Sequence, residues 1–149
     1  MGSAHRPHPE CAGAHGGEYG AATGRPRRVG PFDAVASAYG LKCQNADKIA
    51  LTKLDVLSRM DEIPVITAYK LNDELITEFD PLDDLDSMTP VIQTLPGWNT
   101  DISKCRKYEE LPENARKYIE TLEHLLNHEI QFISVGAERN QYLTKGEWL

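Results

Sequence analysis

The sequence is poor in cysteine and has no long apolar run. Its three cysteines, Cys11, Cys43 and Cys105, are widely spaced, and no CxxC pair occurs. We therefore expect neither a disulfide framework nor a zinc site, and a reducing, cytoplasmic setting. No apolar stretch is long enough to cross a bilayer, and the first residues lack the apolar centre of a signal peptide.

Excess positive charge is also missing. The chain has 16 Lys and Arg against 23 Asp and Glu, which gives a formal net charge of -7. An acidic protein repels polyphosphates and anionic lipids, so we expect no nucleic-acid partner and no membrane partner. The 149 residues, of which 40% are apolar and 26% charged, suffice for one globular domain with a core of its own.

The apolar pattern predicts a mixed α/β fold with flanking helices. Helical spacing at 31–42 (Phe32, Val35, Ala36 and Tyr39) and at 111–127 predicts two helices. Pro112 suits the first turn of the second helix, which carries a long apolar stripe. Short apolar runs predict strands at 49–51, 62–71, 73–79, 90–98 and 130–135, with a hairpin turn near Asn72.

The first fifteen residues differ from the rest of the chain. They hold two prolines and three histidines, His5, His8 and His15, without a periodic apolar pattern. We expect residues 1–15 to be disordered or foreign to the fold, and residues 16–149 to form the domain. A metal site on these histidines is the lesser alternative, because a Pro/Gly-containing stretch gives them no common face.

A basic glycine loop, ATGRPRR, occupies residues 22–28. Gly24 permits unusual backbone angles, and Pro26 stiffens the loop between Arg25 and Arg27. Two guanidinium groups held in this way can each form paired hydrogen bonds with a carboxylate or phosphate, and Thr23 adds a hydroxyl. The loop is therefore either a clamp for a small anion or a solvated basic surface.

Two further motifs follow predicted strands, where ligand loops gather in α/β sheets. In LTKLD, residues 51–55, the carboxylate of Asp55 can accept hydrogen bonds from the ring N–H and the exocyclic amine of guanine. The aliphatic stem of Lys53 can lie over the base. An exposed ion pair is the alternative. The second motif, SVG at 134–136, would let backbone amides approach a planar ligand, or is only a turn.

Taken in order, the motifs GGEYGAATGRPRRVGPFD, ALTKLDVL, TLPGW, LPENARKYIE and SVGAER closely resemble the C-terminal part of adenylosuccinate synthetase. The resemblance runs from Gly16 to Asn140. It implies a fold related to the P-loop NTPases and a GTP-dependent ligase that joins IMP to L-aspartate on the route to AMP. It also implies a cytoplasmic homodimer.

The resemblance assigns roles to both groups of motifs. The loop would bind substrate, with Thr23 and Arg25 holding the aspartate carboxylates, Arg25 also near the IMP ribose, and Arg27 near both the aspartate and the GTP phosphates. Lys53 and Asp55 would frame the guanine, and Ser134–Gly136 would complete its pocket. The substrate-binding set is Ala21, Ala22, Thr23, Gly24, Arg25, Pro26 and Arg27, and the GTP-binding set is Arg27, Lys53, Leu54, Asp55, Ser134, Val135 and Gly136.

The resemblance also leaves a part of the family unmatched. The family's N-terminal portion supplies the phosphate loop, the catalytic aspartate and histidine, the Mg²⁺ ligands and most IMP contacts. We therefore assign no catalytic residue and no metal ligand here, and we expect an inactive fragment. The alternatives are a non-catalytic guanine-nucleotide-binding or regulatory module, and a gene remnant without a stable fold. Ala22, Pro31, Ala137 and Glu138 depart from the family pattern.

Overall fold

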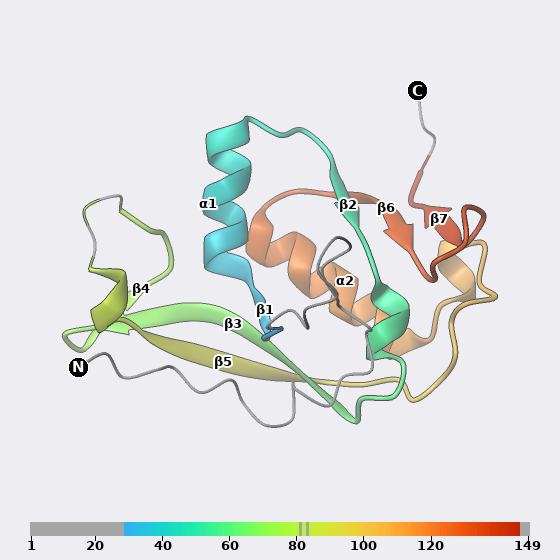
Figure 1. Cartoon of the computed structure of the whole chain (residues 1–149), viewed down its shortest axis with the longest axis horizontal. Coiled ribbons are helices and arrows are strands. Elements are labelled where there is room, and N and C mark those ends of the chain that lie inside the picture. Colours follow the sequence, from blue (N-terminus) through green and yellow to red (C-terminus); the bar gives the residue numbers. More distant parts are fainter. Residues whose placement is uncertain (1–28, 81, 83, 147–149) are drawn as a thin grey trace, which may run out of the picture.

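The computed structural model describes residues 29–80, 82 and 84–146, which form two small sheets with two α-helices. The first sheet is built around β3 (Glu62–Leu71). It pairs antiparallel with β4 (Glu74–Ile76) and β5 (Thr89–Pro96), and parallel with the short β1 (Phe32–Asp33). Figure 1 shows β3 and β5 as a long two-stranded arm. The mixed α/β class is thus confirmed.

The second sheet has β6 (Ile130–Ser134) at its centre. On one side β6 pairs parallel with β2 (Ile49–Leu51), and on the other it pairs antiparallel with β7 (Tyr142–Thr144). The predicted strands are confirmed, although their ends differ by a few residues. The hairpin turn near Asn72 is also confirmed. Asn72 and Asp73 both have positive φ, 49° and 68°, as a tight hairpin turn requires.

Helix α1 (Ala34–Gln44) begins where Asp33 accepts a hydrogen bond from the amide of Ala36 at 2.9 Å. The second carboxylate oxygen of Asp33 accepts a hydrogen bond from the Tyr69 hydroxyl on β3, which ties the helix start to the first sheet. The expected apolar face of Phe32, Val35, Ala36 and Tyr39 is partly wrong. Val35 is buried, but Phe32 lies in β1 before the helix, and Ala36 and Tyr39 are exposed. Small alanines on every side leave the helix without a strong stripe.

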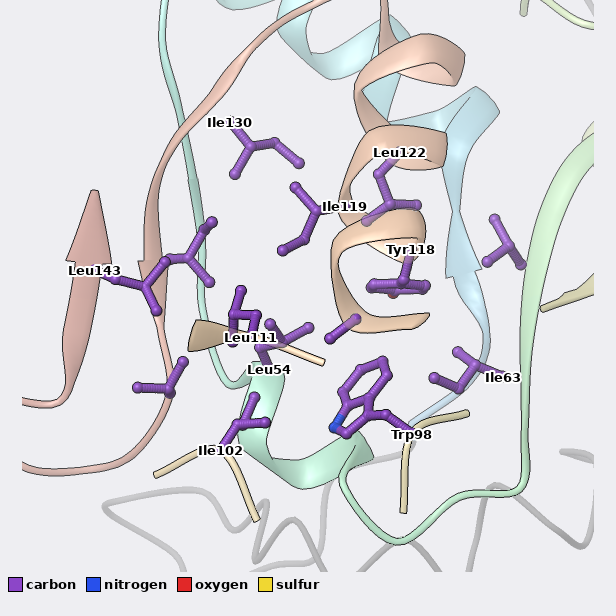
Figure 2. Close-up of a cluster of buried hydrophobic side chains, with 14 residues drawn as sticks. Leu54, Ile63, Trp98, Ile102, Leu111, Tyr118, Ile119, Leu122, Ile130 and Leu143 are labelled. Carbon is purple, nitrogen blue, oxygen red and sulfur yellow. The ribbon is translucent and has the colours of Figure 1, made fainter. Parts of the chain in front are cut away.

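Helix α2 (Glu113–Leu126) packs its apolar stripe against both sheets (Figure 2). Pro112 precedes the first turn with an extended ψ of 149°, so it caps the helix instead of lying inside it. Asn127 ends the helix in the left-handed conformation. The central cluster consists of Leu54, Ile63, Val65, Trp98, Ile102, Leu111, Ala115, Tyr118, Ile119, Leu122, Ile130, Ile133, Val135 and Leu143.

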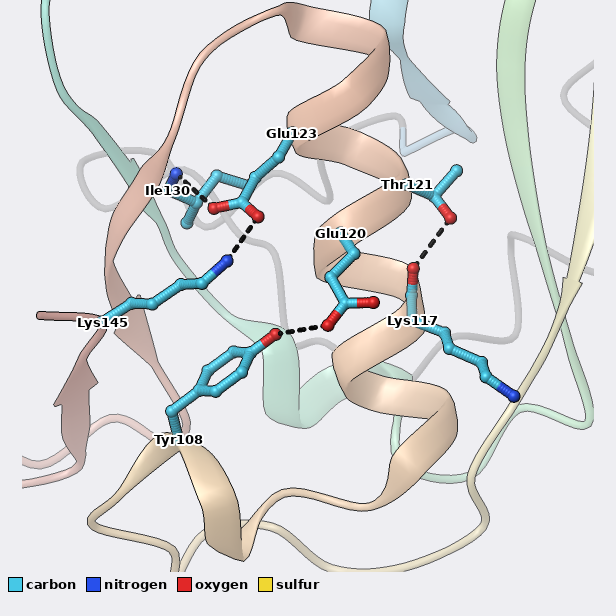
Figure 3. A network of polar contacts seen from close by, with 7 residues as sticks. All are labelled: Tyr108, Lys117, Glu120, Thr121, Glu123, Ile130 and Lys145. Carbon is cyan, nitrogen blue, oxygen red and sulfur yellow. Dashed lines mark hydrogen bonds and ion pairs between the residues drawn. The ribbon is translucent and has the colours of Figure 1, made fainter.

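A polar network joins α2 to the second sheet (Figure 3). One carboxylate oxygen of Glu123 accepts a hydrogen bond from the amide of Ile130 at 2.8 Å, and the other pairs with Nζ of Lys145 at 2.6 Å. The same ammonium group lies 5.2 Å from the ring centre of Tyr108. The network therefore ties the start of β6 and the end of β7 to one helix. Within the described ranges, no helix is long and apolar enough to span a membrane.

Candidate functional site

The candidate site lies where the parallel strands β2 and β6 end. Leu51 lies opposite Ile133 in their register, so the chain leaves both strands at the same edge of the sheet. The short 3-10 helix after β2, Leu54–Leu57, contacts β6. The structure thus brings together the two segments that the sequence singled out separately, Lys53–Asp55 and Ser134–Gly136.

A left-handed residue turns the chain after β2. Lys53 has φ 61° and ψ 36°, a conformation that costs energy for a residue with a side chain. The turn sends the next side chain, Leu54, into the core, where it is 1% exposed. Burial of Leu54 stabilises the strained turn, and the following residue, Asp55, is held at the sheet edge.

Asp55 carries an unsatisfied acceptor. Its Oδ1 atom is buried and accepts no hydrogen bond from the part of the chain that the structure describes. Among the described residues, Nε of Arg116 and Oε1 of Gln131 share this condition. Leaving a buried carboxylate oxygen unpaired destabilises a fold by about 1–3 kcal/mol or more. A ligand that offers N–H groups at this point would remove that cost.

The second segment forms a closed turn after β6. The amide of Val135 donates to the carbonyl oxygen of Gln141 at 2.9 Å, and the hydroxyl of Ser134 donates to the carbonyl oxygen of Gly136 at 3.0 Å. Val135 is fully buried, so it anchors the turn in the core as Leu54 anchors the first one. Two loops, each anchored by one apolar side chain, therefore flank the same edge.

The remaining sequence candidates add nothing to the site in the described part of the chain. The predicted substrate loop, Ala21–Arg27, falls outside the described residues, and so do residues 1–15 with their three histidines. His124 and His128 on and after α2 belong to no group of three or more His, Cys, Asp or Glu that could hold a metal ion, and the rest of the described chain holds no such group. A groove of about 420 Å³ between β5 and α2 is lined by neither loop of the candidate site.

One residue of the site region gave no sequence signal. Gln141 precedes β7 and folds its side chain back against the turn after β6, where its Oε1 accepts a hydrogen bond from the amide of Glu138 at 2.9 Å. A lone glutamine in a polar stretch is not a motif. The position of the Gln141 side chain depends on how the loop between β6 and β7 closes, and no local sequence pattern indicates that closure.

The fold and the site define an α/β protein with a candidate ligand site in the loops that follow neighbouring parallel strands. In α/β proteins such loops are the usual place of ligand contacts. The comparison with known proteins gives the family. The family model for adenylosuccinate synthetase matches residues 7–143, and the chain belongs to the adenylosuccinate synthetase family. The resemblance stated from the sequence is thereby confirmed.

Individual relatives agree with this result. The chain is 43% identical over 135 residues to the adenylosuccinate synthetase of Staphylococcus saprophyticus, which covers 89% of this chain and 32% of that protein. It is 45% identical over 128 residues to the synthetase of Desulforamulus reducens, covering 85% of this chain and 30% of that protein. The chain thus spans about a third of the length of these relatives.

A solved structure gives the same picture. The fully ligated adenylosuccinate synthetase from Plasmodium falciparum superposes with a TM-score of 0.82 at 40% sequence identity, covering 88% of this chain and 32% of that one. The fold of the described residues is therefore that of one part of a synthetase.

Proposed function

We propose that this chain carries the guanine-binding half-site and the aspartate loop of an adenylosuccinate synthetase. The complete protein would use GTP to join IMP and L-aspartate, as a ligase of purine nucleotide synthesis in the cytoplasm. Family membership supports this activity, and the chain spans about a third of the length of its relatives. The part in the reaction that we propose for this chain is binding.

The unpaired Oδ1 of Asp55 is the observation that carries the proposal. Guanine presents two neighbouring donors, the ring N1–H and the exocyclic amine, and a carboxylate presents two neighbouring acceptors. Adenine has an unprotonated N1 on the same edge, so it would leave the buried oxygen unpaired. Selectivity for guanine over adenine follows from this difference.

The neighbouring residues would complete the half-site. Lys53 would lay its aliphatic stem along one face of the base, and the turn Ser134–Gly136 would bring backbone amides to its edge. Leu54 and Val135 would act through the backbone that they anchor, because both side chains are buried in the core.

The phosphate end of the nucleotide and the second substrate belong to other residues. Arg27 would approach the GTP phosphates, while Thr23 and Arg25 within Ala21–Arg27 would hold the aspartate. We assign no Mg²⁺ ligand to this chain, because the resemblance places those ligands in the portion of the family that the chain does not match. The metal and the groups that move protons would come from the portion of the synthetase that this chain does not span, and the homodimer would be formed by the complete protein.

Calorimetric titration of the purified chain with GDP and, separately, with ADP tests the proposal. We expect GDP to bind and ADP to bind at least about tenfold more weakly, because one unpaired buried acceptor suffices for that ratio. Asp55→Ala should abolish the preference. Asp47→Ala is the matched control, because Asp47 is exposed before β2 and should keep it.

Two results would contradict the proposal for this chain. The first is equal affinity for the two nucleotides, or none for either. The second is a GDP preference that survives Asp55→Ala. A separate assay with IMP, aspartate and GTP should yield no adenylosuccinate when this chain is the only protein present.

A further inference from the structure

The turn after β6 is held by one glutamine. Besides accepting from the amide of Glu138, the side chain of Gln141 donates from Nε2 to the carbonyl oxygen of Ser103 at 3.3 Å. Its backbone carbonyl accepts from the amide of Val135, and its own amide donates to the carbonyl oxygen of Glu138, both at 2.9 Å. Gln141 thus closes the segment 135–141 on itself and ties it to a distant loop.

The absence of a side chain at Gly136 makes this arrangement possible. A Cβ atom at Gly136 would lie 2.2 Å from Oε1 of Gln141 and 2.4 Å from its Cδ. The amide group of Gln141 therefore occupies the space that any larger residue at position 136 would need. Because the clash falls on the end of a flexible side chain, an alanine at 136 would displace Gln141 and leave the backbone nearly in place.

We propose that Gln141 is a positioning residue of the guanine half-site, which acts by holding Ser134–Gly136 at the carboxyl end of β6. The inference rests on the proposed function, because the turn matters for binding only if a base lies against it. A ligand that contacts backbone amides gains affinity when those amides are held in place before it arrives. Gln141 supplies that order from outside the contact surface.

Amide hydrogen exchange of the full chain tests the structural half of the proposal. Gln141→Met keeps the length of the side chain and removes both of its hydrogen bonds. The amide of Glu138 loses its acceptor and should exchange about tenfold faster. The amide of Val135 keeps its backbone acceptor on residue 141 and should also exchange faster, because the turn that holds it is loosened. Gln141→Glu retains an acceptor for the Glu138 amide and should restore most of the protection. Gln93→Met, on the exposed face of β5, is the matched control, and the amides of β3 report that each variant is folded. Unchanged exchange in Gln141→Met would overturn the proposal.

GDP affinity tests the binding half. We expect Gln141→Met to weaken GDP about tenfold, Gln141→Glu to recover most of the loss, and Gln93→Met to have no effect. In a Gly136→Ala background, where the amide is already displaced, Gln141→Met should add almost nothing. If the turn exchanges faster in Gln141→Met but GDP affinity is unchanged, the positioning role of Gln141 is overturned and the proposed function stays intact. Failure of the unmodified chain to bind GDP would overturn the proposed function and the positioning role together.

Discussion

Leu51 on β2 and Ile133 on β6 lie opposite each other in a parallel register, and this pairing places the two loops of the candidate site at one edge of a sheet. Two residues beyond Leu51 the chain turns left-handed at Lys53, and two residues beyond Ile133 Val135 starts a closed turn. The candidate site is therefore a consequence of strand pairing between segments about eighty residues apart in the chain.

Glu123 should contribute more to stability than the exposed acids of the same helix. Its side chain is 14% exposed and satisfies both the Ile130 amide and Lys145. Glu123→Ala would leave that amide without its acceptor and the half-buried ammonium without its ion-pair partner, and we expect the free energy of unfolding to fall by about 2–4 kcal/mol. Urea denaturation measures this change.

Glu113→Ala is the control for that experiment. Glu113 also forms an ion pair at 2.6 Å, with Lys117 one turn along α2, but its side chain is 71% exposed. Solvent screens such a pair, so no measurable loss is expected. Equal losses in the two variants would show that the Glu123 network is not a stabilising feature.

Two glycines should respond to alanine in opposite directions. A Cβ at Gly97 would lie 1.7 Å from the backbone oxygen of Met60, so Gly97→Ala should cost about 3 kcal/mol or more. Gly40 lies inside α1 with open space around it, and Gly40→Ala should stabilise the protein by about 0.5–1 kcal/mol. Thermal melts of the two variants should shift in opposite directions from that of the unmodified chain.

The stability of the fold should fall in alkaline solution partly through Tyr118. Burial of this side chain against the core raises its pKa from 10.0 to about 12. Because the folded state holds the proton more tightly, the stabilising contribution is complete below about pH 10. It is lost as the pH rises to about 12, by up to about 1.4 kcal/mol per pH unit.

The variant Tyr118→Phe isolates this contribution. It should be nearly neutral at pH 7 and should unfold with a shallower pH dependence than the unmodified chain between pH 10 and 12. Urea denaturation at several pH values measures the difference, and parallel curves for the two proteins would contradict the assignment.

Elements with a strong pattern could be predicted from the sequence, whereas contacts between distant segments could not. The stripe from Ala115 to Leu126 defines α2, and it packs as expected. Strand β7 went unpredicted because Leu143 is its only buried residue, and pairing with β6 holds it in place. The expected face of α1 fails at Phe32, which pairs in β1, and at Ala36 and Tyr39, which are exposed, because tertiary contacts decide which side of this weakly patterned helix is covered.

In the candidate site, too, some features could be predicted from the sequence and others depend on tertiary contacts. Resemblance and strand ends indicated Lys53, Asp55 and Ser134–Gly136, and strand register explains why they lie together. The left-handed backbone of Lys53, which has no glycine to indicate it, and the unpaired Oδ1 of Asp55 depend on the packing of Leu54. Such features arise from tertiary structure, and only coordinates reveal them.

We propose above that the carboxylate of Asp55 accepts hydrogen bonds from the two donors of guanine. Exchanging the base tests this recognition most directly. Asp55→Asn keeps the shape of the side chain but replaces one acceptor with an N–H₂ donor. Two donors then oppose each other, the new N–H₂ group and the exocyclic amine of guanine. Xanthine carries a carbonyl oxygen at the same position, which can accept a hydrogen bond from the new N–H₂ group. Calorimetry of the unmodified chain and of Asp55→Asn with GDP and XDP gives the answer. We expect the preference to change from GDP to XDP by about tenfold or more. A variant that still prefers GDP would contradict it.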